Sequence, residues 1–361
     1  MARIIGAFLC RRLLYRPRRF SGSAETICHE IVFACWNGEF FRMSIGHFSQ
    51  FWMRDFGIVS PSLIALGERE KVIATLRWAL AHYRSAGRVT TTIFPDGRCA
   101  DLPDPSIDAI PWLVLALHAA DARDVVEEFR PFLMEEIQQY AATVIDPHTG
   151  LLFVHKTYAG LRDSVLYRSS MYANTMLVAL ACFARKLAFD APELDAVAPP
   201  DALVDMYWNG RYFNADARTT AFTAEANLFP FWLGIVSDGT KLESVLAVMR
   251  EKGLTVPLPL AFTDSPKAFR YRRYMRMLAP NYQGTTLWTW LGMIYLQLLE
   301  RAEKSDHAAL RSRFATMIKQ YGTLPELLHP DGSWYTTPCY RADEGLLWAA
   351  LFLKNAQMAY H

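Results

Sequence analysis

Two kinds of helical segment alternate along the chain, and this alternation constrains the fold more than any other feature of the sequence. Segments of the first kind are one-sided, with apolar residues at three- and four-residue steps. In 306–321 the apolar stripe lies opposite the basic residues: Leu310, Phe314, Met317 and Tyr321 against Arg311, Arg313 and Lys319. Segments of the second kind, 107–117, 170–187, 285–299 and 344–353, are apolar nearly all round, as helices buried on every side must be. The pattern predicts an inner ring of buried helices inside an outer amphipathic ring.

This interpretation places about a dozen helices in one all-α domain that begins near residue 25 and runs to residue 361. The expected ranges are 25–36, 57–67, 70–84, 107–120, 124–145, 170–188, 201–207, 225–236, 241–252, 285–303, 306–321 and 343–357. A solenoid would show a regular repeat of roughly 20–50 residues, which the sequence lacks. Residues 1–24, with Arg-Pro-Arg-Arg at 16–19, form a basic and flexible lead-in, or a weak contact with a membrane surface or partner.

Composition narrows the class of partner. The formal net charge is +2, from 38 basic and 36 acidic residues that are interspersed, which argues against nucleic acid and favours a neutral partner. The six cysteines form no CxxC pair and no zinc-like spacing with histidine, so we expect no metal, no cofactor and no disulfides. Reduced thiols and the lack of a secretory pattern at the N-terminus favour the cytoplasm. The longest apolar run, 346–353, is too short to span a bilayer, so we expect no stable membrane insertion.

Polar and aromatic residues just before the buried helices are the candidates for function, because loops at one end of such a ring converge on a pocket. The segment Phe51-Trp52-Met53-Arg54-Asp55 joins a guanidinium fork to a carboxylate and an indole. Arg and Asp side chains can each bond vicinal hydroxyls. The alternative is a salt bridge at a helix start with a tryptophan in the core.

Two further carboxylates precede buried helices. Asp108 lies in the first turn after Ser106, where a carboxylate also simply stabilises the helix dipole. Asp163 follows Arg162 in the loop before 170–188 and could titrate in the pocket.

The last two loops carry aromatic and acidic groups. Residues 281–290 contain Tyr282, Gln283 and Trp288 around a glycine, and are either a platform for a sugar or part of the core. Glu326 lies in a loop that ends at a Pro-Asp-Gly turn. Two carboxylates far apart in sequence, such as Asp163 and Glu326, can flank one glycosidic bond, one protonating the leaving oxygen while the other activates water on the opposite face.

Taken in order, these segments resemble the (α/α)6-barrel glycosidases: the glycogen-debranching α-1,6-glucosidases and, more distantly, glucoamylases, processing glucosidases and neutral invertases. Residues 51–55 are similar to the debranching enzymes' Trp-x-Arg-Asp loop and 106–112 to their Ser-x-Asp-Ala-x-x-Trp helix start. Residues 282–290 look like their Tyr-x-x-Gly-x-x-Trp-Pro-Trp. The resemblance runs from about residue 30 to 357 and implies a six-hairpin (α/α)6 toroid.

The resemblance also implies an activity and roles for residues. It implies an inverting hydrolase of a small α-linked glucoside or related oligosaccharide, with Asp163 as general acid and Glu326 as general base. The terminal sugar would be held by Trp52, Arg54, Asp55, Asp108, Trp112, Tyr282, Gln283 and Trp288. The family's acid motif is typically Trp-x-Asp, whereas this chain has Gly160-Leu161-Arg162-Asp163 and lacks the tryptophan. Because Arg162 would hold a neighbouring carboxylate ionised, Asp108 is the reserve candidate for the acid.

Two other functions remain open. One is a different carbohydrate reaction on the same barrel, namely phosphorolysis, epimerisation or elimination, of which phosphorolysis needs cationic ligands for phosphate in the pocket. The other is a sugar-binding protein that has lost catalysis, which the missing tryptophan before Asp163 favours.

Overall fold

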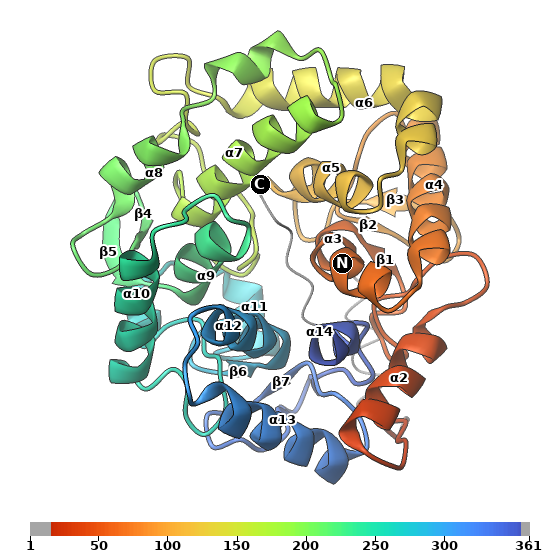
Figure 1. Ribbon diagram of the computed structural model, residues 1–361, viewed down its shortest axis with the longest axis vertical. Helices are drawn as coiled ribbons and strands as arrows, with labels where there is room; N and C mark the ends of the chain where they lie inside the picture. Colours follow the sequence, from red (N-terminus) through yellow and green to blue (C-terminus); the bar gives the residue numbers. More distant parts are fainter. Residues whose placement is uncertain (1–15, 355–361) are drawn as a thin grey trace.

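A closed ring of helices forms the centre of the molecule (Figure 1). The structure, a computed structural model, describes residues 16–354, with the side chains of 274–276 left out. Each inner helix packs against the next, and the last packs against the first, so the ring closes. In chain order these helices are α3 (Met53–Ala65), α5 (Ala109–Ala119), α7 (Met171–Lys186), α9 (Ala224–Trp232), α12 (Thr289–Arg301) and α14 (Ala349–Leu353).

An outer ring surrounds the inner one, and between residues 16 and 354 the chain passes from outer to inner helix six times (Figure 1). The outer helices are α2 (Ala24–Cys35), α4 (Arg69–Ala86), α6 (Arg123–Val144), α8 (Pro200–Tyr207), α10 (Gly239–Glu251) and α13 (His307–Tyr321). The short α11 (Arg273–Leu278) and two 3-10 turns, η1 (Pro192–Ala196) and η2 (Pro266–Ala268), lie in the connections. The predicted (α/α)6 toroid in a single domain is confirmed.

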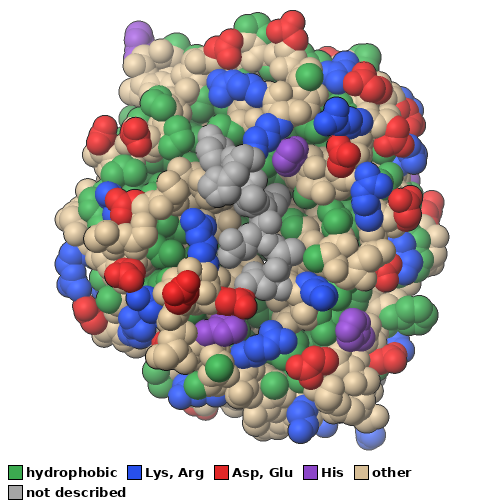
Figure 2. All heavy atoms as spheres, viewed as in Figure 1, with side chains coloured by type: hydrophobic (Ala, Val, Ile, Leu, Met, Phe, Trp, Pro, Cys, Tyr) green, Lys and Arg blue, Asp and Glu red, His purple; other side chains and the backbone are tan. Residues whose placement is uncertain are grey.

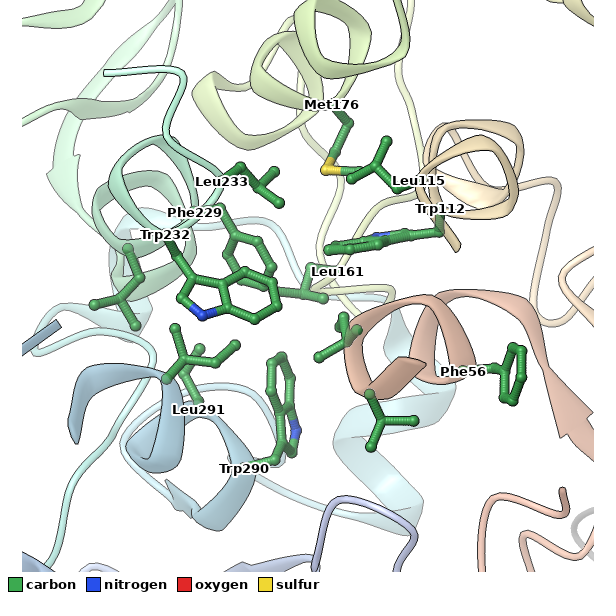
Figure 3. Close-up of a cluster of buried hydrophobic side chains, with 14 of the residues drawn as sticks. Phe56, Trp112, Leu115, Leu161, Met176, Phe229, Trp232, Leu233, Trp290 and Leu291 are labelled. Atoms are coloured by element: carbon green, nitrogen blue, oxygen red, sulfur yellow. The ribbon is translucent and has the colours of Figure 1, made fainter. Parts of the chain in front are cut away.

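The inner helices pack closely because their contact faces combine aromatic side chains with small residues. A Cβ at Gly57 on α3 would lie 2.7 Å from the Cβ of Trp112, so only glycine allows α5 to approach so near. The Trp112 ring in turn lies 6.0 Å from Phe229 and 6.2 Å from Trp232, both on α9 (Figure 3). Such offset and edge-on aromatic contacts fill the middle of the ring and fix the spacing of its helices.

Short sheets tie together the loops before the inner helices. Strands β1 (Phe51–Trp52), β2 (Thr92–Ile93) and β3 (Cys99–Ala100) form one antiparallel sheet, in which Phe51 pairs with Ile93. Strand β6 (Leu287–Trp288) pairs with β7 (Leu327–Leu328), and β4 (Asn214–Asp216) pairs with β5 (Thr219–Phe222). The first sheet thus joins the loop before α3 to the loop before α5, and the β6–β7 pair joins the loop before α12 to the loop before α14.

The helix ends differ most from expectation where the chain approaches the inner ring. The range 285–303 begins as a strand, and its helix α12 starts only at Thr289, because β6 pairs with β7 first. The range 343–357 is helical only from Ala349 to Leu353 within the described residues. Its first residues are irregular because Gly345 has a positive φ of 62° and the backbone of this stretch bonds to residues 43–45. The small strands and α11 were not predicted, since runs of two to four residues carry too little periodicity.

Other predictions concern the ends and surface of the chain. Residues 1–15 of the basic lead-in lie outside the described residues, and its flexibility stays a prediction. Further along the lead-in, the N–H of Phe20 donates to the carbonyl of Gly322 at 2.7 Å. No helix in the described part of the chain is both long and apolar enough to cross a bilayer. On the face shown in Figure 2, acidic and basic side chains are interspersed, with no broad area of one sign.

Candidate active site

A small cavity opens where the loops before four inner helices meet. Its volume is about 80 Å³, and carboxylates, one guanidinium and many aromatic rings line it. The lining residues are Met43, Phe48, Trp52, Arg54, Asp55, Leu161, Asp163, Phe262, Tyr282, Gln283, Trp288, Trp290, Glu326, Leu346 and Trp348. They come from the segments before or at the start of α3, α7, α12 and α14, so residues as far apart in the chain as Met43 and Trp348 contribute to one site.

Arg54 is held by a carboxylate beneath the cavity. Its Nε donates to Oδ2 of Asp108 at 2.7 Å and its Nη2 to Oδ1 at 3.1 Å, while Nη2 also donates to Ser106 at 2.6 Å. Asp108 is fully buried and also accepts from the hydroxyl of Tyr172 at 2.6 Å. A bidentate, charge-assisted pair of this kind fixes the plane of the guanidinium. Asp108 therefore orients Arg54 and does not itself line the cavity.

Asp55 is a second carboxylate on the cavity wall, one residue after Arg54. The pKa of Asp55 is raised to about 7, mainly because the protein encloses it; Arg54 lowers this pKa, and the nearby carboxylates of Asp108 and Asp163 contribute to the rise. A side chain near half-ionisation at neutral pH can both accept and donate hydrogen bonds, which suits contact with sugar hydroxyls.

Arg162 turns away from Asp163. Its guanidinium is fully buried and donates to the carbonyl of Gln283 at 3.1 and 2.8 Å and to the hydroxyls of Tyr167 and Tyr271 at 2.5 and 2.7 Å. Its nearest carboxylate is Glu225, at 3.8 Å. Arg162 thus anchors the loop and leaves the carboxylate of its neighbour to the cavity.

Asp163 keeps an environment that favours its protonated form. The side chain is partly exposed to the cavity, but the surrounding protein raises its pKa. The positive charge of Arg54, a hydrogen bond with Gln283, and the positive charge of Arg272 each lower the pKa of Asp163, but they do not cancel the effect of burial. The expectation that Arg162 would hold this carboxylate ionised was wrong, because the guanidinium points elsewhere.

Glu326 also lines the cavity, and it lies just before β7. Only 2% of it is exposed, and the hydroxyls of Tyr282 and Tyr340 each donate to one of its carboxylate oxygens. The N–H of Asp343 also donates to Oε2, at 3.3 Å. The pKa of Glu326 is raised to about 8, mainly by burial. The hydrogen bonds from the two tyrosines lower this pKa, and the charge of Asp343 contributes to the rise.

Aromatic side chains make up most of the remaining wall. Trp288 donates its Nε1–H to the carbonyl of Tyr282 at 2.7 Å, and the two rings are nearly perpendicular at 4.8 Å. The indole nitrogens of Trp52, Trp290 and Trp348 have no hydrogen-bond partner within the described structure, although they are buried. A buried donor without a partner costs free energy, so these three indoles are less than fully satisfied by the protein itself.

The structure brings most of the predicted site residues together. Eight of them line the one cavity: Trp52, Arg54, Asp55, Asp163, Tyr282, Gln283, Trp288 and Glu326. Trp112 does not, because it is fully buried between α5 and α9 and donates its Nε1–H to Tyr172 at 3.1 Å. Asp108 is likewise beneath the site. Trp112 and Asp108 were expected to contact a sugar; in the structure Trp112 instead bonds to Tyr172, and Asp108 orients Arg54.

Several lining residues were not foreseen. Trp348 lies inside an apolar segment that was assigned to the buried ring, and nothing in the sequence separates a lining tryptophan from a core one. Trp290, which also lines the cavity, ends the segment 281–290 that was expected to be either a sugar platform or part of the core. Phe48, Phe262 and Tyr340 lie in loops outside the motifs, and only the fold brings them to the cavity or to Glu326. Within the described residues, no group of His, Cys, Asp and Glu side chains is arranged to hold a metal ion.

Of the comparisons with known proteins, the one with solved structures finds matches. No protein-family model and no curated protein matches the sequence. Among solved structures, a GH63 mannosylglycerate hydrolase from Thermus thermophilus matches with a TM-score of 0.60 and 13% identity over 91% of this chain and 98% of that one. A glycosidase variant in complex with glucose gives a TM-score of 0.66 and 15% identity over 91% and 94% of the two chains.

A third neighbour is larger. A rhamnosidase from Klebsiella oxytoca, with rhamnose bound, has a TM-score of 0.65 and 13% identity over 91% of this chain and 62% of that one. At such identities the likeness concerns the arrangement of the backbone. The family resemblance expected from the sequence is thus confirmed at the level of architecture, and the chain has the (α/α)6-barrel fold that these glycosidases share.

Proposed function

We propose that the chain is an inverting glycoside hydrolase that acts on the terminal sugar of a small, neutral α-linked glucoside or related oligosaccharide. The observation that carries the proposal is the pair Asp163 and Glu326, which come from separate loops and line one cavity. Asp163 serves as general acid and protonates the leaving oxygen. Glu326 serves as general base and takes a proton from the attacking water on the opposite face.

The hydrogen bonds of Glu326 suit a base. Glu326 becomes an ionised carboxylate as the pH rises through its pKa of about 8, and an ionised carboxylate offers about four lone-pair positions. Tyr282, Tyr340 and the N–H of Asp343 use three of them, which leaves about one for the hydrogen of a water molecule. The two phenols also fix the orientation of the carboxylate, so that the remaining position has a defined direction.

The same cavity suits a neutral sugar better than an anionic one. Arg54 is the one cation among the residues that line it within the described structure, and Asp108 and Ser106 already engage its guanidinium. Three carboxyl groups, from Asp55, Asp163 and Glu326, also line the cavity. A phosphate group would meet these carboxyls without a free cation, which disfavours phosphorolysis relative to hydrolysis.

The size of the cavity limits what it encloses. At about 80 Å³ it is far below the roughly 300–1,000 Å³ of pockets that enclose drug-sized ligands. One terminal sugar therefore fits better than an internal stretch of a glycan. The similar structures are described with mannosylglycerate hydrolysis, rhamnose or glucose, so mannosides, rhamnosides and glucosides belong in the same screen.

The test combines a substrate screen with two variants. In a panel of neutral α-glucosides, α-mannosides and α-rhamnosides, proton NMR follows the first-formed sugar, which under inversion is the β-anomer. Asp163→Asn and Glu326→Gln should each lower kcat by about 10²–10⁴. Asp331→Asn is the matched control and should leave kcat unchanged, since Asp331 is an exposed carboxylate in the turn that follows β7.

Two results would overturn the proposal. Wild-type turnover in either catalytic variant would remove that residue from the mechanism, and an α-anomer as first product would exclude inversion. Binding of a sugar without turnover of any glycoside in the panel would favour the sugar-binding alternative. We also propose a cytoplasmic location, because the six cysteines show no pattern typical of a disulfide framework.

A further inference from the structure

Asp343 is a fully buried carboxylate that the reaction proposed above does not use. It lies in the irregular segment before α14, and none of its surface is exposed. Its Oδ2 accepts from the hydroxyl of Ser44 at 2.5 Å and from the N–H of Phe48 at 2.9 Å. Its Oδ1 accepts from the N–H of His47 at 3.1 Å, and Nδ1 of the His47 ring is 3.4 Å from the same oxygen. The carboxylate is thus the centre around which residues 44–48 fold.

The fit between this loop and Asp343 is close. A Cβ at Gly46 would lie 1.6 Å from Oδ1 of Asp343, so the loop can wrap the carboxylate only with glycine at this position. The N–H of Gly46 in turn donates to the hydroxyl of Ser44 at 2.9 Å. A loop that wraps a carboxylate this tightly has its position set by that carboxylate.

The loop contributes directly to the cavity. Phe48 is one of the lining residues, and its ring lies edge-on to Trp52 at 6.0 Å. The position of Asp343 therefore determines where the Phe48 wall stands relative to the Trp52 indole.

The same residue is bonded to the candidate base through its backbone. The N–H of Glu326 donates to the carbonyl of Asp343 at 2.9 Å, and the N–H of Asp343 donates back to the Glu326 carboxylate. A second connection runs through His47, whose ring lies edge-on to Tyr340 at 5.5 Å, while the Tyr340 hydroxyl donates to Glu326. Side chain and main chain of Asp343 thus act on two different parts of the site.

We propose that Asp343 is a positioning residue, which fixes the loop 44–48 through its side chain and Glu326 through its backbone, so that the base and the Phe48 wall face the same sugar. The inference deepens the proposed function and rests on Glu326 as the base. Asp343 does not line the cavity, so it acts on the reaction through Glu326 and Phe48.

The position of Asp343 also has an electrostatic consequence for Glu326. Several titratable groups lie near Glu326: the phenols of Tyr282, Tyr340 and Tyr335 and the carboxylate of Asp343. Asp343 raises the pKa of Glu326, since two nearby negative charges repel. Removing that charge should therefore make Glu326 easier to ionise.

The first test needs no substrate. Carbon-13 NMR of chain labelled at the glutamate carboxyl carbons follows the titration of Glu326, whose signal is identified by its loss in Glu326→Gln. In Asp343→Asn this titration should move to lower pH. The matched control is Asp216→Asn, because Asp216 likewise accepts from loop N–H groups, those of Arg218 and Thr219 at 2.8 Å, but it does not line the cavity. It should leave the titration of Glu326 where it is in the wild type.

A folded Asp343→Asn whose Glu326 titrates as in the wild type would overturn the electrostatic coupling, whether or not a glycoside is ever found to be hydrolysed. The second variant, Ser44→Ala, keeps the charge and removes one donor to the carboxylate. When a hydrolysed glycoside is available, Ser44→Ala should lower kcat by up to about tenfold and leave the pH dependence of kcat unchanged. Asp343→Asn should lower kcat more, and it should shift the acid limb of the pH profile to lower pH.

If Asp343→Asn fails to fold, Ser44→Ala decides the positioning role alone. A kcat equal to that of the wild type would then refute it, and a lower kcat with unchanged pH limbs would support it. Failure of the proposed function is seen separately, as an absence of turnover in the wild type itself.

Discussion

Replacing Glu326 by Gln should change how the stability of the chain depends on pH, independently of any substrate. In the folded chain burial raises the pKa of Glu326 from 4.5 to about 8. A carboxyl whose pKa is higher in the folded than in the unfolded chain contributes stability that is complete below the unfolded value and is lost as pH rises through the folded value. Protonated Glu326 therefore adds to the stability of the folded chain below about pH 8, and this contribution is lost as the group ionises.

The size of the effect follows from the interval between the working pH and that pKa. Each pH unit corresponds to about 1.4 kcal/mol. At pH 6 the folded chain holds the Glu326 proton almost fully, and at pH 9 it has nearly lost it. Between these values the wild type should lose about 2–3 kcal/mol of unfolding free energy through Glu326 alone. Gln cannot lose a proton, so this part of the pH dependence should vanish in the variant.

Urea unfolding at pH 6 and pH 9, followed by tryptophan fluorescence, measures the difference. The quantity compared is the loss of unfolding free energy between the two pH values, wild type against Glu326→Gln, which cancels groups that titrate in both. Glu30→Gln, exposed on α2, is the control and should behave as the wild type. Equal losses in the wild type and Glu326→Gln would refute the argument, since Glu326 would then ionise as easily in the folded chain as in water.

Three further predictions test other parts of the site. Arg54→Lys loses the bidentate contact to Asp108 and should lower kcat/KM for a hydrolysed glycoside about 10–100-fold; an unchanged value would mean that the fork does not orient the site. A glucuronide should not be turned over where the matching neutral glucoside is, because three carboxyl groups line the cavity, and comparable kcat/KM values would contradict this charge argument. Trp112→Ala should lower the unfolding free energy by about 3–5 kcal/mol in urea, since a buried ring between α5 and α9 is removed, whereas a loss below about 1 kcal/mol would show that the core there is loose.

The fold could be predicted because the two helix types differ in how much of their surface is apolar. Helices α6 and α13 keep a polar face toward solvent, whereas nearly all of α7 is buried, and this contrast is a direct consequence of inner and outer position. The ends of the inner helices were harder to predict. At β6 and at Gly345, contacts with distant segments determine where the backbone leaves the helix, and no local pattern reports them.

The sequence identified the loops that form the site, but it did not show which residues in them line the cavity and which support another side chain. Trp52, Arg54 and Asp55 are adjacent in the chain, so their joint appearance at a helix start could be recognised. The bond between Tyr340 and Glu326 crosses an irregular loop, and the contacts of Asp343 with Ser44 and Phe48 span about 300 positions. Such pairs depend on closure of the ring, which places the loop before α14 against the chain that precedes α3.

Arg54 and Asp108 illustrate why taking one motif at a time misassigns roles. Alone, the Arg54-Asp55 pair could be a salt bridge between neighbours and Asp108 a helix-start carboxylate. In the folded chain the strong partner of Arg54 is Asp108, from the next inner helix, and this pairing frees Asp55 for the cavity. The buried carboxylate thus neutralises and orients the one cation of the described cavity wall, and the carboxylate on the wall is left to meet the ligand. A carboxylate supplied from the start of α5 therefore converts a local ion pair on α3 into a site with an acidic group available to a sugar.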